Sequence, residues 1–509
     1  MQWLNKVVDE AIAKHPEGEI LVSSGVSPSG KYHLGTLREV LTAEVIMREL
    51  KRRGRASRHI HFVDDLDGLR KVPVGVPEDF EQYLGKPLCQ VPSPDGVAQS
   101  YADYYLNDLV NASKTLALQI DIQRSQKRYK EGFFVPAIEL ALEHIEDVRE
   151  VLQNISGHKL GEEWSPIQVN EDGYLKKRRF ISIDKQAKTV IYEDRQAKQQ
   201  LISYAAGDVK LDWRIDWPAR WWLLQVAVEP FGRDHATKGG SYDTGAALSA
   251  KVFNSEPPLP VPYAFINRSG ETKKMSKSAG DTVDLAQLLQ ILPPEAVWFF
   301  VIRYAPDKQL FFDEGDGVVR LIDEFAELSA KPGKTPEEQQ LLELCTQGLE
   351  PTVSSVPFSH LVASYQAALK DPDKTLGVLG RTEYQKAVQD EAGVIKSELK
   401  FIGKWLQNWA PEDVKFELAQ SVSAADFSNQ EKAFLADLAA KIEQAPPGAD
   451  GQWFHKAIYD LKESGSLTPQ QVFEPLYQAI IGQKSGPRAG WFLSMLDRGW
   501  LVKRLKLEA

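Results

Sequence analysis

One stretch near the start of the chain, residues 19–68, constrains the fold most, because a strand, a helix and a second strand follow one another in it. The apolar strand "EILVSSG" (Glu19 to Gly25) runs into a loop of glycine, serine and proline. The helical pattern "LREVLTAEVIMRELKRRG" has neither glycine nor proline before Gly54, which is placed to end the helix. The apolar "SRHIHFVDDLDG" follows as the next strand. Strand, helix and strand within about fifty residues predict a βαβ unit and therefore a parallel sheet.

This alternation is then interrupted. From about residue 73 to residue 208 the sequence combines prolines, a long helical stretch (134–156) and a basic, hairpin-like stretch (173–194), and we interpret this part as an insertion. Alternation resumes at Trp217 with a helix, a strand, a loop and a helix. A further strand then precedes a basic loop at 271–280.

The end of the chain has a different character. Residues 329–340 are typical of a linker, in which Pro336 is suited to the first position of a helix. Beyond this linker the pattern is almost wholly helical. We therefore predict an α/β, Rossmann-like parallel-sheet domain with an insertion in residues 1–330, helical after the basic loop, and an all-α domain in residues 331–509.

Composition excludes several classes of protein. The chain of 509 residues is long enough for two or three domains. It contains no apolar run of about 18 residues and begins with an amphipathic, partly acidic segment, so we expect no membrane span, no signal peptide and a cytoplasmic location. Its two cysteines, Cys89 and Cys345, exclude a disulfide framework and an all-cysteine metal site. The net charge of -10 argues against indiscriminate nucleic-acid binding, but it allows a local basic face.

The first candidate motif is "GVSPSGKYHLGT", where the first strand turns into the helix. Gly25, Gly30 and Gly35 would let the backbone approach a ligand closely, and the helix start offers N–H groups and a positive dipole end to a phosphate. Lys31 and His33 add donors at the same place. An ordinary strand-to-helix turn has a similar composition, so this motif alone leaves both readings open.

The second candidate motif is "KKMSKS", inside the basic loop. Its lysines can meet the charge that develops during phosphoryl or nucleotidyl transfer, if the loop closes over a polyphosphate. A solvated basic loop is the alternative. The loop follows a predicted strand of the sheet, which would put it at the carboxyl edge together with the first motif, where open α/β sheets bind ligands. The basic and hydroxyl side chains of the motif are Lys273, Lys274, Ser276, Lys277 and Ser278.

Together, the two motifs resemble the two signatures of class I aminoacyl-tRNA synthetases. "HLGT" stands at the position of His-Ile-Gly-His, and "KMSKS" (Lys274 to Ser278) matches the second signature letter for letter. Four further stretches are similar to class I lysyl-tRNA synthetase, so that the resemblance covers nearly the whole chain: "HFVDDLDGLRKVP", "DWRIDWPARW", "EPFGRDHATKGGSYDTG" and "GPRAGWFLSMLDRGWLVKRL".

The resemblance implies an enzyme that activates L-lysine with ATP and Mg²⁺ and transfers it to lysine tRNA, with a C-terminal helical cage that reads the anticodon. The alternatives are another class I adenylate-forming enzyme, either a glutamyl-type synthetase or a ligase that passes an activated amino acid to a small thiol or amine, and a non-catalytic tRNA-binding paralogue. A ligase with a small acceptor would not need the long helical end, and the paralogue is disfavoured by the presence of His33, Lys274 and Lys277.

Two departures from the family pattern affect the expected cofactors. Thr36 replaces the last histidine of the first signature, so one phosphate donor is weaker or absent. Related enzymes often hold zinc on paired cysteines in the insertion, whereas the equivalent stretch here has no cysteine, and we expect no structural zinc and no other resident metal. The sequence does not indicate an oligomeric state.

By resemblance, His33 and Lys277, supported by Lys274, are the catalytic residues that neutralise developing charge. The residues expected to bind ATP come from both motifs. They are Pro28, Gly30, His33, Gly35 and Thr36, and Lys274, Met275, Ser276, Lys277 and Ser278.

A lysine pocket needs a slot for four methylenes and an acceptor for the ammonium. The candidate acceptors are Asp64, Asp65 and Asp67, for which a solvated turn or pairing with Arg70 and Lys71 is the alternative. Trp213 and Trp217 are candidate walls that face the cation, with core packing as the alternative. The resemblance adds Gly25, Ser27 and His235 to the substrate site.

The C-terminal end is basic and aromatic. Arg488, Trp491, Arg498 and Arg504 are the candidates for tRNA binding there, because splayed anticodon bases are recognised by stacking and hydrogen bonds. A capping helix with a solvated charged face is the alternative.

Overall fold

A computed structural model describes residues 1–157, 159–161, 164–270 and 283–508. They form two compact units. Unit 1 comprises Met1–Leu289, Trp298–Phe312 and Thr335–Leu349, and unit 2 comprises Gln290–Val297, Asp313–Lys334 and Glu350–Ala509.

This division differs from the single boundary expected after residue 330, because the chain returns to unit 1 after that residue. The returning segment contains helix α12 (Pro336–Thr346), which begins at Pro336 after a capping box on Thr335. It packs against α2 (Leu34–Arg52), and Arg48 of α2 donates to the carbonyl of Gln347 at 3.1 Å.

Unit 1 is built around a five-stranded parallel sheet in the order β11-β10-β1-β2-β3, which confirms the predicted βαβ unit. Val22 of β1 lies opposite His59 of β2 on one side and Val228 of β10 on the other. The strands of this sheet are β1 (Ile20–Val26), β2 (Ser57–Val63), β3 (Ile120–Arg124), β10 (Val226–Gly232) and β11 (Leu259–Tyr263).

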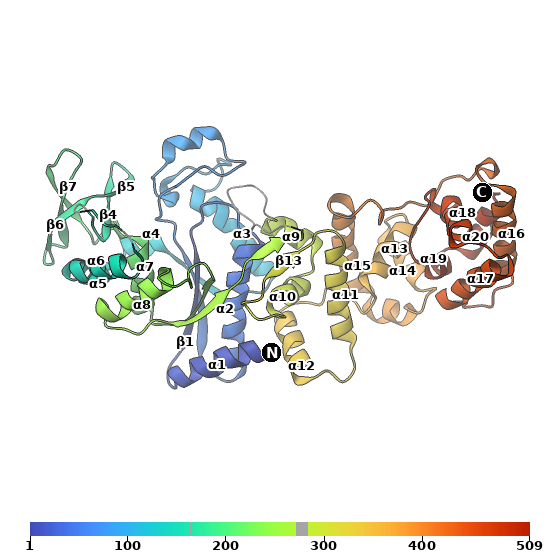
Figure 1. The fold of residues 1–509 in the computed structure, drawn as a ribbon, viewed down its shortest axis with the longest axis horizontal. Coiled ribbons are helices and arrows are strands. Elements are labelled where there is room, and N and C mark those ends of the chain that lie inside the picture. The colour runs from blue at the N-terminus through green and yellow to red at the C-terminus, as the bar shows by residue number, and fades with distance from the viewer. Residues whose placement is uncertain (158, 162–163, 271–282, 509) are drawn as a thin grey trace. The chain divides into compact units, whose positions relative to one another are not determined.

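Helix α2 packs on this sheet against β1, β2 and β10, and Figure 1 shows it in blue beside β1. It is buried over most of its length, which fits its continuous apolar pattern. The other helices of unit 1 are α1 (Gln2–Lys14), α3 (Tyr101–Thr115), α4 (Ser125–Lys130), α5 (Val135–Glu143), α6 (Ile145–Asn154), α7 (Trp213–Leu224) and α8 (Ser241–Lys251), with 3-10 turns at Glu78–Tyr83 and Leu88–Gln90.

The predicted insertion at 73–208 needs a correction, because β3 lies inside that range and belongs to the main sheet. The sequence does not reveal β3, since "IDIQR" is a polar edge strand that is only half-buried. The predicted long helix 134–156 is also divided, at His144, into α5 and α6.

The basic hairpins of the insertion are confirmed as antiparallel strands in two small sheets, ordered β5-β4-β9 and β6-β7-β8. Their bounds are β4 (Ile167–Glu171), β5 (Tyr174–Lys177), β6 (Arg179–Asp184), β7 (Thr189–Glu193), β8 (Gln199–Ser203) and β9 (Val209–Leu211).

The strand that precedes the basic loop differs from expectation. Residues 259–268 form two strands, β11 in the main sheet and β12 (Ile266–Arg268), which pairs in parallel with β13 (Leu310–Phe312) as a separate two-stranded sheet. The loop therefore follows the small sheet instead of the main one, because the chain leaves β11 at Ala264 before it forms β12.

Unit 2 is helical apart from its connecting segments, and the predicted helical end is confirmed. Phe434, Leu438, Phe454, Leu476 and Phe492 are among the buried side chains of its core. Its helices are α11 (Asp316–Ala330), α13 (Phe358–Ala367), α14 (Pro372–Leu379), α15 (Gln385–Asn408), α16 (Asn429–Glu443), α17 (Gly451–Ser464), α18 (Pro469–Ile481), α19 (Ala489–Met495) and α20 (Arg498–Leu505), with a 3-10 turn at Ala424–Asp426.

Helices α9 (Leu285–Ile291) and α10 (Pro294–Ile302) contain residues of both units. Among the described residues, no single helix has the length and apolar composition to cross a membrane. Only the pair α9 and α10 together meets those two criteria, and it bends by 110° at its break.

Candidate active site

The start of α2 has the geometry that the first motif predicts. His33 is the N-cap residue, and its Nδ1 accepts the backbone N–H of Gly35 at 3.0 Å. Nδ1 therefore carries no proton in this arrangement, and the proton of a neutral imidazole is on Nε2. A side chain at Gly35 would collide with this ring, because a Cβ there would lie 2.7 Å from His33 Cε1. Thr36 donates its backbone N–H to the His33 carbonyl at 2.9 Å.

The loop between β1 and α2 keeps its small residues close to neighbouring backbone. Pro28 and Gly30 are buried in this loop. A Cβ at Gly25 would lie 2.9 Å from the carbonyl oxygen of Phe62 on β2, so the close approach of β1 and β2 requires glycine at that position.

The chain returns to this same place directly after the second motif. Asp284 forms an isolated bridge with His33, its carboxylate lies 3.0 Å from Lys31 Nζ, and Leu34 donates to the Val283 carbonyl at 3.3 Å. The segment that carries "KMSKS" therefore ends beside the first motif. Its residues, Lys274, Met275, Ser276, Lys277 and Ser278, lie outside the described part of the chain.

A pocket of about 290 Å³ opens at the carboxyl ends of β1, β2 and β10. This is the edge at which open α/β sheets bind ligands. Seven of the eight predicted substrate residues line it. Its other lining residues include three charged ones that the sequence did not point to, Glu39, Arg220 and Glu229. The seven are Gly25, Ser27, Asp64, Asp67, Trp213, Trp217 and His235.

Asp65 is the predicted residue that the pocket lacks. It is fully buried, with Arg124 Nε 2.7 Å from Oδ2 and the backbone N–H of Gln126 2.8 Å from Oδ1. These contacts join β2 to the end of β3, so in this structure Asp65 has a structural role.

Asp64 and Asp67 do line the pocket, but cationic side chains of the chain itself already neutralise them. The buried ammonium of Lys210 lies 3.0 Å from Asp67 Oδ1 and 3.4 Å from Asp64 Oδ1. Arg220 Nη2 lies 3.1 Å from Asp64 Oδ2, and Ser27 Oγ donates to Asp67 Oδ2 at 2.8 Å.

The pKa values of these two carboxyls move in opposite directions. Burial and the neighbouring Asp67 charge raise the pKa of Asp64 to about 6, against the opposing effect of Lys210 and Arg220. Burial acts in the same direction on Asp67, but the Lys210 ammonium and the Ser27 hydroxyl outweigh it, so the pKa of Asp67 lies below its usual value.

The structure brings Trp213, Trp217 and His235 together along one side of the pocket. The Trp217 ring lies 5.5 Å from the His235 ring and 5.5 Å from the Phe231 ring, and Trp213 lies 6.2 Å from His235. Trp217 and Trp213 are both half-buried, so their rings are exposed in part to the pocket.

Glu39 is one of two pocket carboxylates that were not predicted from the sequence, the other being Glu229. It lies on α2, and its two oxygens accept the backbone N–H of Gly25 at 2.8 Å and the hydroxyl of Tyr263 at 2.6 Å. The signal was present, because Glu39 interrupts the apolar pattern of α2 one turn after the first motif, but nothing in the sequence pairs it with Tyr263 on β11.

The four C-terminal candidates separate into two pairs. Arg488 and Trp491 line a cavity of about 820 Å³ within unit 2, where the Trp491 ring stacks on His360 at 4.1 Å. Arg498 donates to the carbonyls of Ala445 and Pro446, and Arg504, 2% exposed, donates to the carbonyl of Ala419. The guanidinium groups of this second pair stabilise loops of unit 2.

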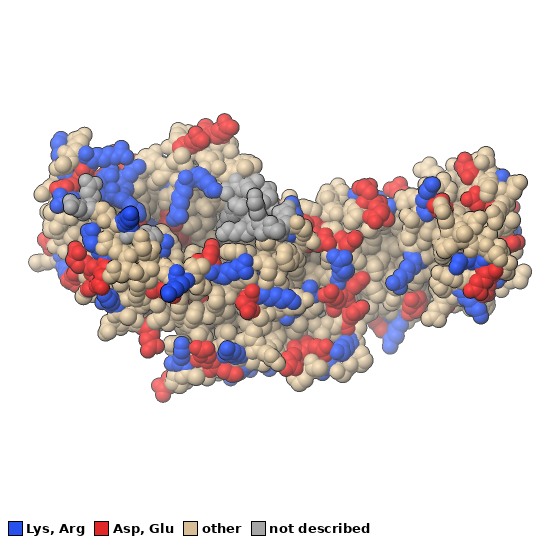
Figure 2. Space-filling view, viewed as in Figure 1, with Lys and Arg blue, Asp and Glu red and all other residues tan. Residues whose placement is uncertain are grey.

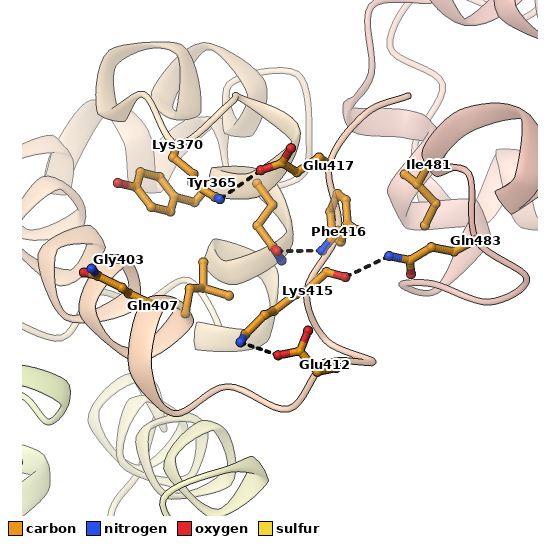
Figure 3. Close-up of a pocket in the computed structure, with 12 residues that line it drawn as sticks. Tyr365, Lys370, Gly403, Gln407, Glu412, Lys415, Phe416, Glu417, Ile481 and Gln483 are labelled. Carbon is orange, nitrogen blue, oxygen red and sulfur yellow. Dashed lines mark hydrogen bonds and ion pairs between the residues drawn. The ribbon is translucent and has the colours of Figure 1, made fainter. Parts of the chain in front are cut away.

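Unit 2 has a second cavity, of about 670 Å³, shown in Figure 3. Its two lysines are already paired with acidic neighbours, Lys370 with Glu417 at 3.2 Å and Lys415 with Glu412 at 2.7 Å. A charged ligand would have to compete with these exposed pairs, so the cavity shows no prepared anion site.

No group of three or more histidine, cysteine, aspartate or glutamate side chains with metal-binding geometry occurs in the described ranges. Both cysteines are free thiols. The candidate site therefore consists of a helix start, a charged pocket and an aromatic wall.

Comparison with known proteins finds relatives over the full length of the chain. The family described as tRNA synthetases class I (K) matches residues 1–347. The "Lysine--tRNA ligase" of Methanosarcina barkeri strain Fusaro is 33% identical over 531 residues, covering 99% of this chain and 97% of the relative. That of Archaeoglobus fulgidus is 33% identical over 509 residues, covering 99% of each chain. A crystal structure of a glutamate tRNA ligase from Elizabethkingia meningosepticum has a TM-score of 0.43 at 13% identity and covers 96% of this chain and 98% of its own. By its family match and its full-length relatives, the chain belongs to the class I tRNA synthetases (K).

Proposed function

We propose that the protein is a lysine--tRNA ligase, which activates L-lysine with ATP, releases pyrophosphate and transfers the lysyl group to lysine tRNA. One feature of the site supports this proposal most directly. A pocket with a carboxylate, Glu39, and a tryptophan wall lies next to the helix start capped by His33. The relatives that match over the full chain are named lysine--tRNA ligases, and nothing in the site favours a glutamyl-type ligase or a non-catalytic paralogue.

The lysine side chain is held by its two chemically different parts. Glu39 accepts the ammonium, and the Tyr263 hydroxyl, which donates to Glu39, has lone pairs that can accept from the same ammonium. The faces of Trp213 and Trp217 pack against the methylenes and attract the cation. Glutamate is refused, because its carboxylate would face Glu39 without a countercharge.

The remaining pocket residues bind the α-amino and carboxylate groups of lysine. Asp64 and Asp67 are fixed in place by Lys210 and Arg220 and line the pocket beside the α-ammonium with their charges already paired. Gly25 and Ser27 supply close backbone and a hydroxyl, and His235 borders the wall. Asp65 does not line the pocket. It affects the pocket residues only by binding Arg124 and so holding the end of β2 to the end of β3.

The chemistry at the α-phosphate needs alignment and charge neutralisation more than covalent catalysis. Because His33 Nδ1 accepts the Gly35 N–H, Nε2 is the ring nitrogen that can donate to a phosphate at the helix start. Lys274 and Lys277 neutralise the charge that moves onto the leaving pyrophosphate. Mg²⁺ enters with the nucleotide, bound by its phosphates. The ATP site is completed by Pro28, Gly30, Gly35 and Thr36 and by Met275, Ser276 and Ser278.

Two basic or aromatic surfaces are candidates for the tRNA. Figure 2 shows lysine and arginine side chains gathered over the insertion strands that Figure 1 labels β4 to β7, which suits a phosphate backbone. In unit 2, Arg488 and Trp491 border the 820 Å³ cavity, and burial together with Arg488 lowers the pKa of His360 to about 4. His360 is therefore neutral at physiological pH and offers, with Trp491, a stacked aromatic pair for an unpaired base. Arg498 and Arg504 support this region through the loops they hold.

We further propose that the enzyme acts in the cytoplasm and needs no zinc. The proposed activity is tested by ATP–pyrophosphate exchange with each of the twenty amino acids, with and without tRNA, since related enzymes sometimes need tRNA for activation. Lysine alone is expected to drive exchange. Strong exchange with glutamate and none with lysine would refute the assignment.

A further inference from the structure

Glu229 occupies a position where a carboxylate is costly. It lies in the middle of β10, a central strand of the sheet in which every residue is buried, and only 6% of Glu229 is exposed. A buried carboxylate needs hydrogen bonds or a countercharge to remain there. Burial raises the pKa of Glu229, and hydrogen bonds from Trp217, Trp221 and Ser23 oppose that rise together with the charge of Arg220.

Two of the hydrogen-bond partners of Glu229 are tryptophan rings. Trp217 Nε1 lies 3.0 Å from Oε1, and Trp221 Nε1 donates to Oε2. The two tryptophans are four residues apart on α7, so they lie on the same face of the helix, with ring centroids 4.9 Å apart. One carboxylate therefore fixes two indoles at once.

The charge of Glu229 is not cancelled by a bonded cation. Within the described ranges, no lysine, arginine or histidine forms an ion pair with it. The guanidinium of Arg220, whose charge acts on Glu229, is itself paired with Asp64 and Asp216. Glu229 also lines the substrate pocket, so its negative charge lies directly behind the aromatic wall.

We infer that Glu229 is a specificity-determining positioning residue that acts through Trp217. The carboxylate accepts the indole N–H and polarises the ring, so that the face of the ring toward the pocket becomes more negative. An ammonium is attracted to that face by the ring quadrupole, and the attraction strengthens where water is excluded. The pair thus favours a cationic side chain over a neutral one of the same length. The inference rests on the proposed function, because it assumes that lysine is the ligand of this pocket.

The test compares two ligands that differ only in charge. Lysine and 6-hydroxy-L-norleucine have the same side-chain length, with a hydroxyl in place of the ammonium in the second. The KM of lysine and the inhibition constant of the hydroxyl analogue are measured by ATP–pyrophosphate exchange in the unaltered enzyme and in Glu229→Gln, which keeps the size of the side chain and removes its charge.

We expect Glu229→Gln to raise the lysine KM about tenfold, to change the inhibition constant of the analogue less than about twofold, and to leave kcat within about threefold. Equal losses for both ligands would show that Glu229 only holds the wall in shape and would overturn the inference. Failure of the unaltered enzyme to use lysine would instead refute the proposed function, so the two failures are distinguishable.

Two further variants keep the inference testable if Glu229→Gln does not fold. Trp217→Phe keeps an aromatic wall but loses the N–H that links it to Glu229, and it should also reduce the preference for lysine over the analogue. If Glu229→Gln does not fold, an unchanged preference in Trp217→Phe overturns the inference. Trp222→Phe is the matched control, because Trp222 lies on the same helix, stacks on Phe253 and does not line the pocket.

Discussion

Lys210 Nζ lies 3.0 Å from Asp67 Oδ1, and the Lys210 side chain is only 1% exposed. Lys210 comes from β9 in the insertion, whereas Asp67 follows β2 of the main sheet, so this ion pair joins the two parts at the pocket. Replacing Lys210 by methionine would leave the carboxylates around it with one countercharge fewer in a buried place. Removing one partner of a buried pair typically costs about 3–5 kcal/mol. We expect a loss of that order in the free energy of unfolding of Lys210→Met, measured by urea denaturation.

The matched control is Lys177→Met, on strand β5 of the same small sheet. Lys177 pairs with Asp212 at 2.6 Å, but its side chain is 63% exposed. An exposed ion pair contributes about 0–1 kcal/mol, so this variant should be nearly as stable as the unaltered protein. Similar losses in both variants would contradict the buried role of Lys210.

A second prediction concerns the ammonium of the substrate. Glu39→Gln removes the negative charge of the proposed acceptor. Its amide oxygen can still accept the Gly25 N–H, and its NH2 can donate to the Tyr263 hydroxyl, which then accepts instead of donating. Losing one partner of a desolvated ion pair costs about 2–5 kcal/mol, so the KM for lysine should rise about 100-fold or more while the KM for ATP changes little. Tyr263→Phe removes one neutral hydrogen bond and should raise the KM for lysine no more than about tenfold. Equal increases in both KM values for Glu39→Gln would mean that the variant distorts the whole site.

A third prediction follows from a buried carboxyl in unit 2. Glu398 is completely buried, Oε2 accepts from the backbone N–H and the hydroxyl of Ser354, and burial raises the pKa of Glu398 to about 8. The folded state therefore holds a proton that the unfolded state has lost between about pH 4.5 and pH 8. Stability is accordingly highest below this window and falls as pH rises through it, by at most about 1.4 kcal/mol per pH unit from this one group.

Glu398→Gln tests this sign directly, because the neutral side chain cannot lose a proton. Urea denaturation from pH 5 to pH 8 should show a smaller decline in the free energy of unfolding for the variant than for the unaltered protein. A steeper decline in the variant would contradict the assignment of the proton to Glu398.

The parts of the site that depend on a single segment with regular apolar spacing could be predicted from the sequence. The βαβ unit and the helix start at His33 could be predicted because apolar spacing and glycine positions determine them locally. The same reading treated Asp64 and Asp65 alike, although successive residues at the end of a strand point to opposite sides. The structure puts Asp64 in the pocket and Asp65 against Arg124.

The residues that the sequence could not supply depend on long-range register. Lys210 is 143 positions from Asp67, and Tyr263 is 224 positions from Glu39. In the sequence, Glu229 looks like any other residue of a strand, because the two indole N–H groups that bind it come from a separate element, α7. Such pairs arise from the packing of distant elements, and no local pattern encodes them.

A fourth prediction concerns metal. The strand-rich part of the insertion, residues 166–194, has no cysteine, and its strands are held by hydrogen bonds, ion pairs such as Lys177 with Asp212, and apolar side chains such as Val169 and Val190. Elemental analysis of the purified, chelator-treated protein should find no stoichiometric zinc, and the treated protein should keep its full activity once Mg²⁺ is restored. About one zinc ion per chain would reveal a site built from histidine and carboxylate ligands.

The final prediction concerns Lys277 of the "KMSKS" motif, whose segment ends next to His33 at Asp284. The charge that Lys277 meets develops only as pyrophosphate leaves, so Lys277→Ala should slow adenylate formation more than it weakens lysine binding. Removing one preorganised charge donor typically lowers the rate by on the order of 10²–10³. If Lys277 acts chiefly in the transition state, kcat and kcat/KM for ATP fall together, whereas a ground-state role would raise KM with kcat nearly unchanged. Transfer from preformed adenylate to tRNA should be affected less, because pyrophosphate has already left. Single-turnover kinetics of the two steps distinguishes these outcomes, and an unchanged activation rate would show that the lysine is merely part of a solvated basic loop.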